Sequence, residues 1–159
     1  MGVLSGTEIK RYLKEKKLTI EPFDHANIGA ASVDLTLGNE FRYFIHHNGP
    51  VSISDEADGK PYYLGPGQMC LGITRENVKL PSDLCALVEG RSRFARLGLS
   101  VHITASFINP GVDNQTVLEI FNASSLTLAL YPGTKVCQMI FMTMEGKAEY
   151  KGIFQGQAL

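Results

Sequence analysis

The sequence predicts a mainly β fold, a distorted jelly-roll-like β-barrel with one short N-terminal α-helix. Roughly ten short apolar segments are separated by turn residues about every ten positions, which is typical of β-sandwiches and barrels. Only one segment, near the N-terminus, has the spacing of an amphipathic helix. The chain has 159 residues and shows no internal repeat or linker, so we expect a single domain over residues 1–159.

The predicted helix starts at Ser5. The run Ser5-Gly-Thr-Glu8 is a capping box, in which the serine hydroxyl accepts from the Glu8 amide and the Glu8 carboxylate reaches back to the Ser5 amide. Ile9 and Leu13 follow as an apolar stripe. The stripe ends in a charged run at 14–17, which we interpret as a solvent-exposed face, with phosphate binding as the less favoured alternative.

Strands are predicted over most of the remaining chain. Val33, Leu35 and Leu37 alternate with polar residues, which predicts a strand with one buried face. A turn is predicted at Gly38-Asn39, between this strand and the next. The predicted strands are 18–20, 31–37, 40–46, 51–53, 62–64, 69–74, 84–89, 100–105, 117–122, 126–130 and 136–142. The polar stretch 48–67 is expected to be a surface excursion, and the last ten residues a tail that orders only against something else.

Composition and charge exclude several classes of protein. Apolar residues make up 44% of the chain, charged residues 19%, and the net charge is −1, so nothing favours nucleic acid as a partner. Cys70, Cys85 and Cys137 are odd in number and far apart, which suits a reducing compartment. The sequence contains no C-x-x-C motif and no His-rich spacing, which argues against a zinc site. We find no signal-peptide pattern and no apolar run long enough to cross a membrane, so we expect a cytoplasmic protein.

The stretch from Val88 to Glu119 contains the strongest candidate for a functional site. Arg91, Arg93 and Arg96 fall within six residues. Guanidinium groups bond phosphate oxygens in pairs, and Ser92 adds a hydroxyl, so the cluster predicts an anion site. The alternative is a surface turn with exposed arginines, or with ion pairs to the acids at 83 and 89.

Glu119 is the second candidate in this stretch. In strict alternation it shares a strand face with Val117 and Phe121, so a carboxylate is inserted into an apolar row. A carboxylate between an apolar wall and a guanidinium is suited to acid–base chemistry. A glutamate on an edge strand that points to water is the alternative.

Three further polar residues receive structural interpretations. His102, between two apolar residues, is predicted to be a satisfied core residue. Asn109-Pro-Gly is predicted to be a turn. Gln138 is predicted to face a barrel rim or a subunit contact.

Taken in order, several stretches resemble the dCTP deaminase family, whose members are relatives of the trimeric dUTPases. The stretches are 90–99 (GRSRFARLGL), 101–105 (VHITA), 108–111 (INPG), 117–119 (VLE), 20–24 (IEPFD), 31–38 (ASVDLTLG), 130–133 (LYPG), 138–141 (QMIF) and 150–157 (YKGIFQGQ). The match runs nearly end to end, and as an ordered set it is highly specific.

The resemblance implies a dUTPase-like barrel, a homotrimer with three active sites at the subunit interfaces, and a flexible closing tail over about 148–159. The implied reaction is hydrolytic deamination of dCTP to dUTP and ammonia without zinc or another catalytic metal. Mg²⁺ is implied only as a chelate of the triphosphate, and dTTP as a feedback inhibitor.

The resemblance also implies roles for individual residues. Glu119 takes a proton from the water that attacks cytosine C4 and delivers protons to N3 and the leaving amine. Ser92 and Arg96 orient this water and stabilise charge, and the Ala105 carbonyl holds it. The implied nucleotide-binding residues are Arg91, Ser92 and Arg93 along the triphosphate, Asn109 at the sugar, Gln138, and Tyr150 and Gln157 in the tail.

Some positions depart from the family pattern. Arg93 replaces a second serine, Asn109 an aspartate, and Ile153 a tail lysine, while 112–114 replaces an aromatic-x-Gly. An amide cannot act as a base, so Asn109 weakens the alternatives of a dUTPase or a bifunctional deaminase–diphosphatase. A shifted specificity and a non-catalytic nucleotide-binding relative are further alternatives.

Overall fold

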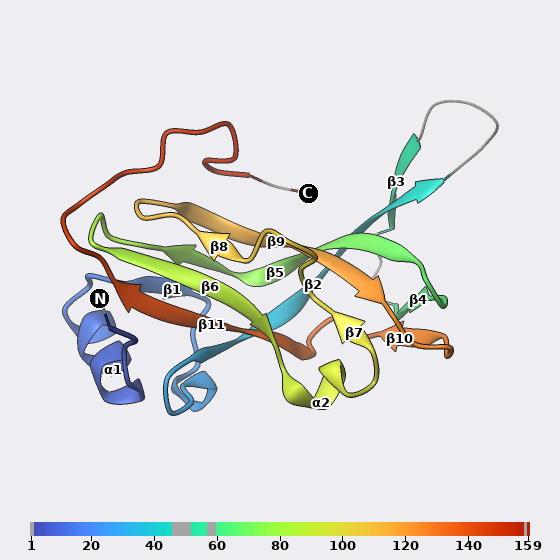
Figure 1. The fold of residues 1–159 in the computed structure, drawn as a ribbon, viewed down its shortest axis with the longest axis horizontal. Coiled ribbons are helices and arrows are strands. Elements are labelled where there is room, and N and C mark those ends of the chain that lie inside the picture. The colour runs from blue at the N-terminus through green and yellow to red at the C-terminus, as the bar shows by residue number, and fades with distance from the viewer. Residues whose placement is uncertain (1, 46–51, 57–59, 158) are drawn as a thin grey trace.

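A curled antiparallel β-sheet forms the body of the molecule (Figure 1). The computed structural model describes residues 2–45, 52–56, 60–157 and 159. The strands described are β1 (Thr19–Glu21), β2 (Val33–Ile45), β3 (Ser52–Glu56), β4 (Tyr62–Leu64), β5 (Met69–Lys79), β6 (Leu84–Gly90), β7 (Leu99–Ser100), β8 (Phe107–Ile108), β9 (Asp113–Asn122), β10 (Leu128–Leu130) and β11 (Lys135–Thr143). The main sheet follows the order β7-β9-β5-β2-β11-β6-β8, with β1 on β5 and β3 on β2, and β4 pairs separately with β10. The predicted mainly β, barrel-like fold is confirmed as a curled sheet.

The helices of the described residues are few and short. The longest is α1 (Gly6–Lys14), followed by the 3₁₀ turn η1 (His25–Asn27) and the single turn α2 (Ser92–Ala95). At the start of α1, the Ser5 hydroxyl accepts from the Glu8 amide at 3.3 Å, as predicted. The Glu8 carboxylate instead binds Arg11, at 2.6 Å, so only half of the capping box is confirmed. Neither η1 nor α2 is predicted as a helix from the sequence, since each is a single short turn.

The predicted turn at Gly38-Asn39 is wrong. Strand β2 continues through both residues, and its register against β5 shifts between Leu37 and Phe41. A Cβ at position 38 would lie 2.9 Å from the carbonyl oxygen of Ile73. A glycine is therefore needed at position 38 because two backbones approach closely at an irregular point of the sheet. In the sequence, such a glycine cannot be distinguished from a glycine in a turn.

The predicted strand over 100–105 is also wrong. Only Leu99 and Ser100 are in a strand, β7, and the chain from 101 to 106 is irregular. The neighbouring strands β5 and β9 are longer than predicted. Of the apolar residues Val101 and Ile103, only Val101 packs into the core, whereas Ile103 is 49% exposed. The apolar pattern of 101–105 therefore does not mark a strand.

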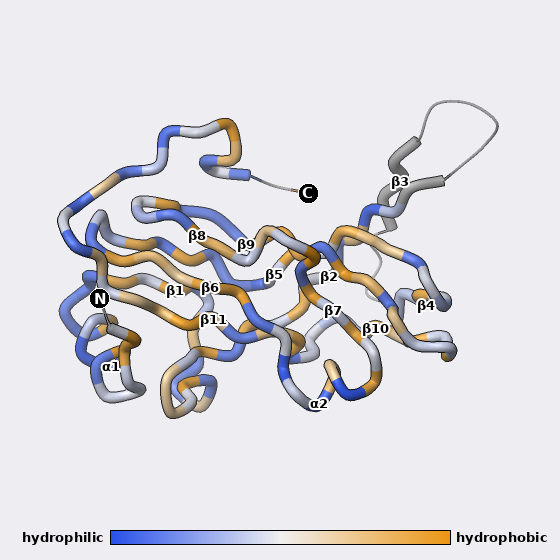
Figure 2. Tube along the Cα trace, viewed as in Figure 1, coloured by the Kyte–Doolittle hydropathy of each residue, from blue (hydrophilic) through white to orange (hydrophobic). Residues whose placement is uncertain are grey.

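Strand β9 separates the hydrophobic core from the face that carries Glu119. Residues 114, 116, 118, 120 and 122 are buried, and the alternate residues, including Glu119, are half-buried. The core cluster draws on most strands and on Ile9 of α1. Figure 2 shows hydrophobic stretches along β6 and β11, with hydrophilic stretches at α1 and at several turns.

The part of the chain that the structure describes contains neither a membrane-spanning helix nor a disulfide. No helix there is long and apolar enough to span a bilayer. The three cysteines are free and buried, and burial raises the pKa of the Cys70 thiol to about 12.

Thr74 supports a stability prediction. It is fully buried, and its hydroxyl accepts from the Thr116 amide and donates to the Glu76 carbonyl, each at 2.9 Å. Thr74→Val keeps the side-chain volume but leaves both backbone groups without this partner, so we expect the free energy of unfolding to fall by about 1–3 kcal/mol. Urea denaturation measures the change, with the exposed Thr127→Val as control; equal midpoints for the two variants would contradict the prediction.

Candidate active site

A pocket of about 330 Å³ lies between β9, the segment before β8 and the C-terminal tail. Its lining contains five residues that the sequence analysis placed in the active site: Ala105, Asn109, Glu119, Tyr150 and Gln157. Leu71, Val88 and Val117 contribute apolar walls, and no lysine or arginine is among the described residues that line it. The pocket therefore offers one carboxylate and several neutral polar groups within apolar surroundings.

Glu119 is held in this pocket by its strand and by one backbone amide. Its strand neighbour on β5 is Leu71, and the Ile103 amide donates to its Oε2 at 2.9 Å. Its other carboxylate oxygen, Oε1, has no hydrogen-bond partner among the described residues. A half-buried carboxylate with one oxygen fixed and the other free can accept a proton from a water molecule in the pocket. The prediction that Glu119 shares one half-buried strand face with Val117 and Phe121 is confirmed.

His102 also lines the pocket, so the prediction of a satisfied core residue is wrong. Its side chain is 26% exposed, and its Nε2 lies 3.5 Å from Oε2 of Glu89. Its Nδ1 is buried and has no hydrogen-bond partner in the described part of the chain. This pairing with Glu89 has no signal in the sequence, because the two residues lie in segments that only the tertiary fold brings together.

The predicted Asn109-Pro-Gly turn is confirmed and anchors the C-terminal tail. The Tyr150 amide donates to the Pro110 carbonyl at 2.9 Å, and Nε2 of Gln155 donates to the Gly111 carbonyl at 3.2 Å. Gly111 has φ +76°, and a Cβ there would lie 2.8 Å from Cγ of Glu149. Figure 1 shows the tail arching beyond β8 and β9. The tail thus orders against a turn of its own chain and brings Tyr150 and Gln157 to the pocket.

Arg91 lies outside the Glu119 pocket and has partners of its own. Its guanidinium forms an ion pair with Asp34 at 3.0 Å and donates to the Lys135 carbonyl at 2.9 Å. The predicted alternative of ion pairs was therefore right in kind, but the acid is Asp34 rather than residue 83 or 89. The contact ties the start of α2 to β2 and β11.

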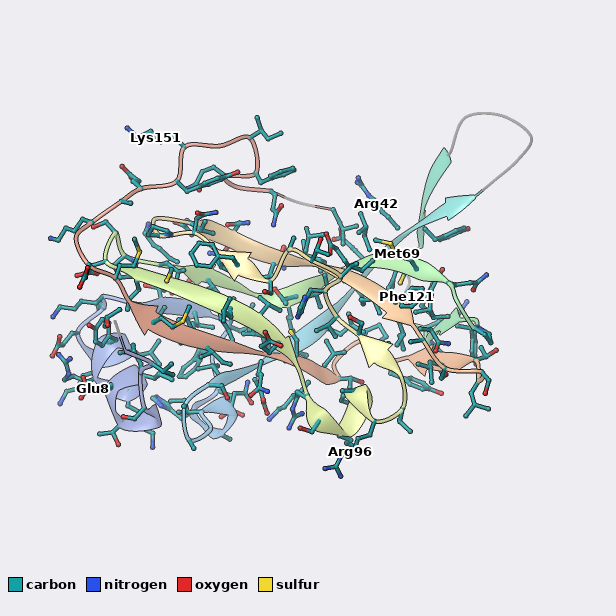
Figure 3. All side chains as sticks on the ribbon, in the orientation of Figure 1. Glu8, Arg42, Met69, Arg96, Phe121 and Lys151 are labelled. Atoms are coloured by element: carbon teal, nitrogen blue, oxygen red, sulfur yellow. The ribbon has the colours of Figure 1, made fainter. Side chains whose placement is uncertain are left out.

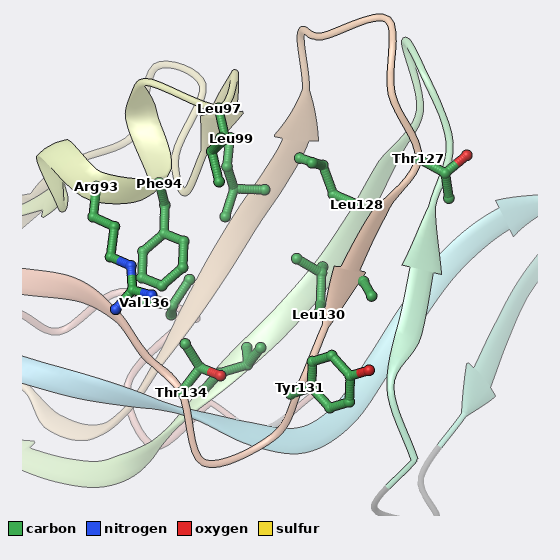
Figure 4. Close-up of a pocket in the computed structure, with 12 residues that line it drawn as sticks. Arg93, Phe94, Leu97, Leu99, Thr127, Leu128, Leu130, Tyr131, Thr134 and Val136 are labelled. Carbon is green, nitrogen blue, oxygen red and sulfur yellow. The ribbon is translucent and has the colours of Figure 1, made fainter.

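The other members of the arginine cluster are exposed on α2. Ser92 and Arg96 face solvent, and Figure 3 shows Arg96 pointing outward on the side of the molecule opposite to the tail. Arg93 lines a separate pocket of about 460 Å³, whose other walls are mostly apolar (Figure 4), and it stacks 5.7 Å from the ring centroid of Phe94. The arginine helix, which is α2 with Arg91 and Arg96 at its two ends, is therefore separate from the Glu119 pocket within one chain. Ser92 and Arg96, which the resemblance implies act beside Glu119, are not among the described residues that line this pocket.

Gln138 lies near the arginine helix rather than near Glu119. Its Oε1 accepts from the Ser32 hydroxyl at 2.8 Å, and its Nε2 donates to the Gly90 carbonyl at 3.2 Å. These bonds connect β11 to the residue before β2 and to the end of β6, directly before α2 begins. Gln138 therefore supports the backbone from which the arginines project.

The described residues contain no group of three or more His, Cys, Asp and Glu side chains that could hold a metal ion. Carboxylate, imidazole and thiolate groups are the usual protein ligands of zinc. The single carboxylate and single imidazole of the pocket are too few to make a zinc site from this chain's described side chains.

Comparison with solved structures defines the class of fold. The chain matches a dUTPase mutant from phage phi11 of S. aureus with a TM-score of 0.57, at 13% identity, over 89% of this chain and 99% of that one. It matches 2′-deoxycytidine 5′-triphosphate deaminase from Agrobacterium tumefaciens with a TM-score of 0.73, at 21% identity, over 90% of this chain and 48% of that one. The fold is therefore dUTPase-like.

Sequence comparison then defines the family. The dCTP deaminase-like family matches residues 3–144. A relative from Dictyoglomus turgidum, named dCTP deaminase, dUMP-forming, is 42% identical over 92% of this chain and 83% of its own. A relative from Colwellia psychrerythraea, named dCTP deaminase, is 41% identical over 91% of this chain and 83% of its own. This chain belongs to the dCTP deaminase-like family.

Proposed function

We propose that this protein is an enzyme that deaminates dCTP to dUTP and ammonia by hydrolysis, without a catalytic metal. The observation that carries the proposal is Glu119, a single half-buried carboxylate with one oxygen bound by an amide and one oxygen free in a largely apolar pocket. The family to which the chain belongs, and the names of its relatives, support cytosine nucleotides as the substrate class.

The reaction requires water to be activated by protein groups. In our proposal, Glu119 accepts a proton from a water molecule that the Ala105 carbonyl also holds, and the hydroxide attacks cytosine C4. Glu119 then delivers this proton to N3, takes up the proton of the new C4 hydroxyl and passes it to the amine, so that the C4–N bond breaks and dCTP and water yield dUTP and ammonia. A positioned acid–base group contributes about 10²–10⁴-fold in rate, and the apolar walls keep other water away from the base.

The triphosphate needs cations that this pocket does not contain among its described lining residues. The exposed side chains of Ser92 and Arg96, and Arg93 beside them, are available to a second molecule. We propose that a homotrimer joins the two halves: one subunit contributes Glu119, and its neighbour contributes the arginine helix that binds phosphates and stabilises charge. Mg²⁺ enters as a chelate of the triphosphate.

The product distinguishes deamination alone from deamination coupled to triphosphate cleavage. The Dictyoglomus relative is named dUMP-forming. Asn109 lines the pocket with an amide, which cannot act as a base. We expect dCTP to yield dUTP with little dUMP or pyrophosphate, measured by chromatographic separation of the products. Asn109→Asp is the matched variant and is expected to raise the dUMP fraction. Abundant dUMP from the unchanged protein would instead favour the bifunctional alternative.

A non-catalytic nucleotide-binding protein is the second candidate, favoured by the departures at Arg93, Asn109 and Ile153. Ile153 is 90% exposed on the tail, where the family pattern has a lysine. Calorimetric binding of dCTP without any product would support this candidate. We propose dTTP as a competing inhibitor, so binding of dTTP alone does not separate the two candidates. The three free thiols suit a reducing, cytoplasmic setting.

A further inference from the structure

We propose that Glu89 is a positioning residue that orients Glu119 through His102 and the amide of Ile103. This inference rests on the proposed function, because it concerns the carboxylate assigned there to proton transfer. Glu89 itself is not among the residues that line the pocket, so it acts from outside the space that the substrate would occupy.

The Ile103 amide, which binds Glu119, lies in a segment with few backbone hydrogen bonds. Between β7 and β8, residues 101–106 have no strand partners. The bond from the Val88 amide to the Ser106 carbonyl, at 2.9 Å, fixes only the far end of this segment. Ile103 is 49% exposed, so its side chain adds little packing. Side-chain contacts must therefore hold the Ile103 amide in place.

His102 provides those contacts. Its carbonyl accepts a hydrogen bond from the Ser100 hydroxyl, and its imidazole Nε2 lies 3.5 Å from the Glu89 carboxylate. Since Nδ1 has no partner in the described part of the chain, Glu89 is the polar group that faces the ring. Loss of the Glu89 charge would weaken this polar contact of the mostly buried imidazole, because a neutral amide oxygen is a weaker acceptor than a carboxylate.

Glu89 is held in the sheet through its backbone, and its side chain is 43% exposed. It lies on β6, directly opposite Gln138 on β11, in the longest uninterrupted ladder of the sheet. The order of contacts therefore runs from a rigid strand to His102, then to the adjacent amide of Ile103, and finally to Oε2 of Glu119. A displacement of about 1 Å in a catalytic geometry costs about 10²-fold in rate.

The first test separates kcat from KM for dCTP. Glu89→Gln keeps the shape and removes the charge; we expect kcat to fall about 10- to 100-fold while KM changes less than about threefold. Glu89→Asp restores the charge on a shorter chain and is expected to recover part of the lost kcat. The exposed Glu145→Gln serves as control and should leave both constants unchanged. An unchanged kcat in Glu89→Gln, or a lowered urea midpoint with no recovery in Glu89→Asp, would overturn the inference.

The second test does not require activity. Hydrogen exchange of the Ile103 amide, followed by NMR on the full chain, is expected to speed up about tenfold in Glu89→Gln. If the unchanged protein does not deaminate dCTP but this amide responds, the proposed function fails and the positioning contact stands. If exchange in Glu89→Gln equals that of the unchanged protein, the positioning role fails whatever the activity.

Discussion

Glu119→Gln is expected to lower the turnover of dCTP by at least about 10²–10⁴-fold, the contribution of a positioned acid–base group. The glutamine keeps the size of the side chain and can still accept from the Ile103 amide through its oxygen. It cannot take a proton from water, so the chemical step is lost and the pocket is retained. Steady-state kinetics with dCTP and Mg²⁺ measures the loss.

Nucleotide binding provides the internal check on this variant. We expect the dissociation constant for dCTP, measured by calorimetry, to change little in Glu119→Gln, because the substitution alters neither the tail nor α2. Glu145→Gln, at an exposed position, should retain full turnover. A Glu119→Gln protein that turns over dCTP at the original rate would show that another group carries the proton.

Mixing two inactive variants is expected to restore activity. Arg96 is exposed and its side chain forms no hydrogen bond or ion pair within the described residues, so Arg96→Ala should fold normally and lose about 10²-fold or more in kcat. If one subunit supplies Glu119 and its neighbour supplies Arg96, co-expression with Glu119→Gln creates some sites in which both residues are intact. With random assembly, about one site in four is restored.

The geometry within one chain is the reason for this expectation. Arg96 points outward from α2 on the side of the molecule opposite to the tail, whereas the tail closes the Glu119 pocket (Figure 3). Co-expression of each variant with a tagged copy of itself is the matched control and should restore nothing. Activity of the mixture no greater than the sum of the separate variants, together with a trimer by light scattering, would place both residues in one subunit's site.

Strands with one buried face are the ones that the sequence predicts well. Alternation along 117–122 and 136–142 reports a sheet with one buried face, and both segments are strands. Alternation does not report an irregularity, so Gly38 looked like a turn although it permits close backbone approach to Ile73. It also does not distinguish a paired strand from a loop with one buried residue, which is why 101–105 was assigned wrongly.

By itself, the sequence determined the mainly β class, the Asn109-Pro-Gly turn and the family, because these depend on local periodicity, local turn preferences and ordered motifs. Only the tertiary structure decided which candidate residues meet. It placed Glu119, Ala105 and the tail around one pocket and left the arginine helix elsewhere, because strand order brings distant segments together without regard to their spacing in the chain. It also revealed the contact between Glu89 and His102, which no spacing in the chain indicates.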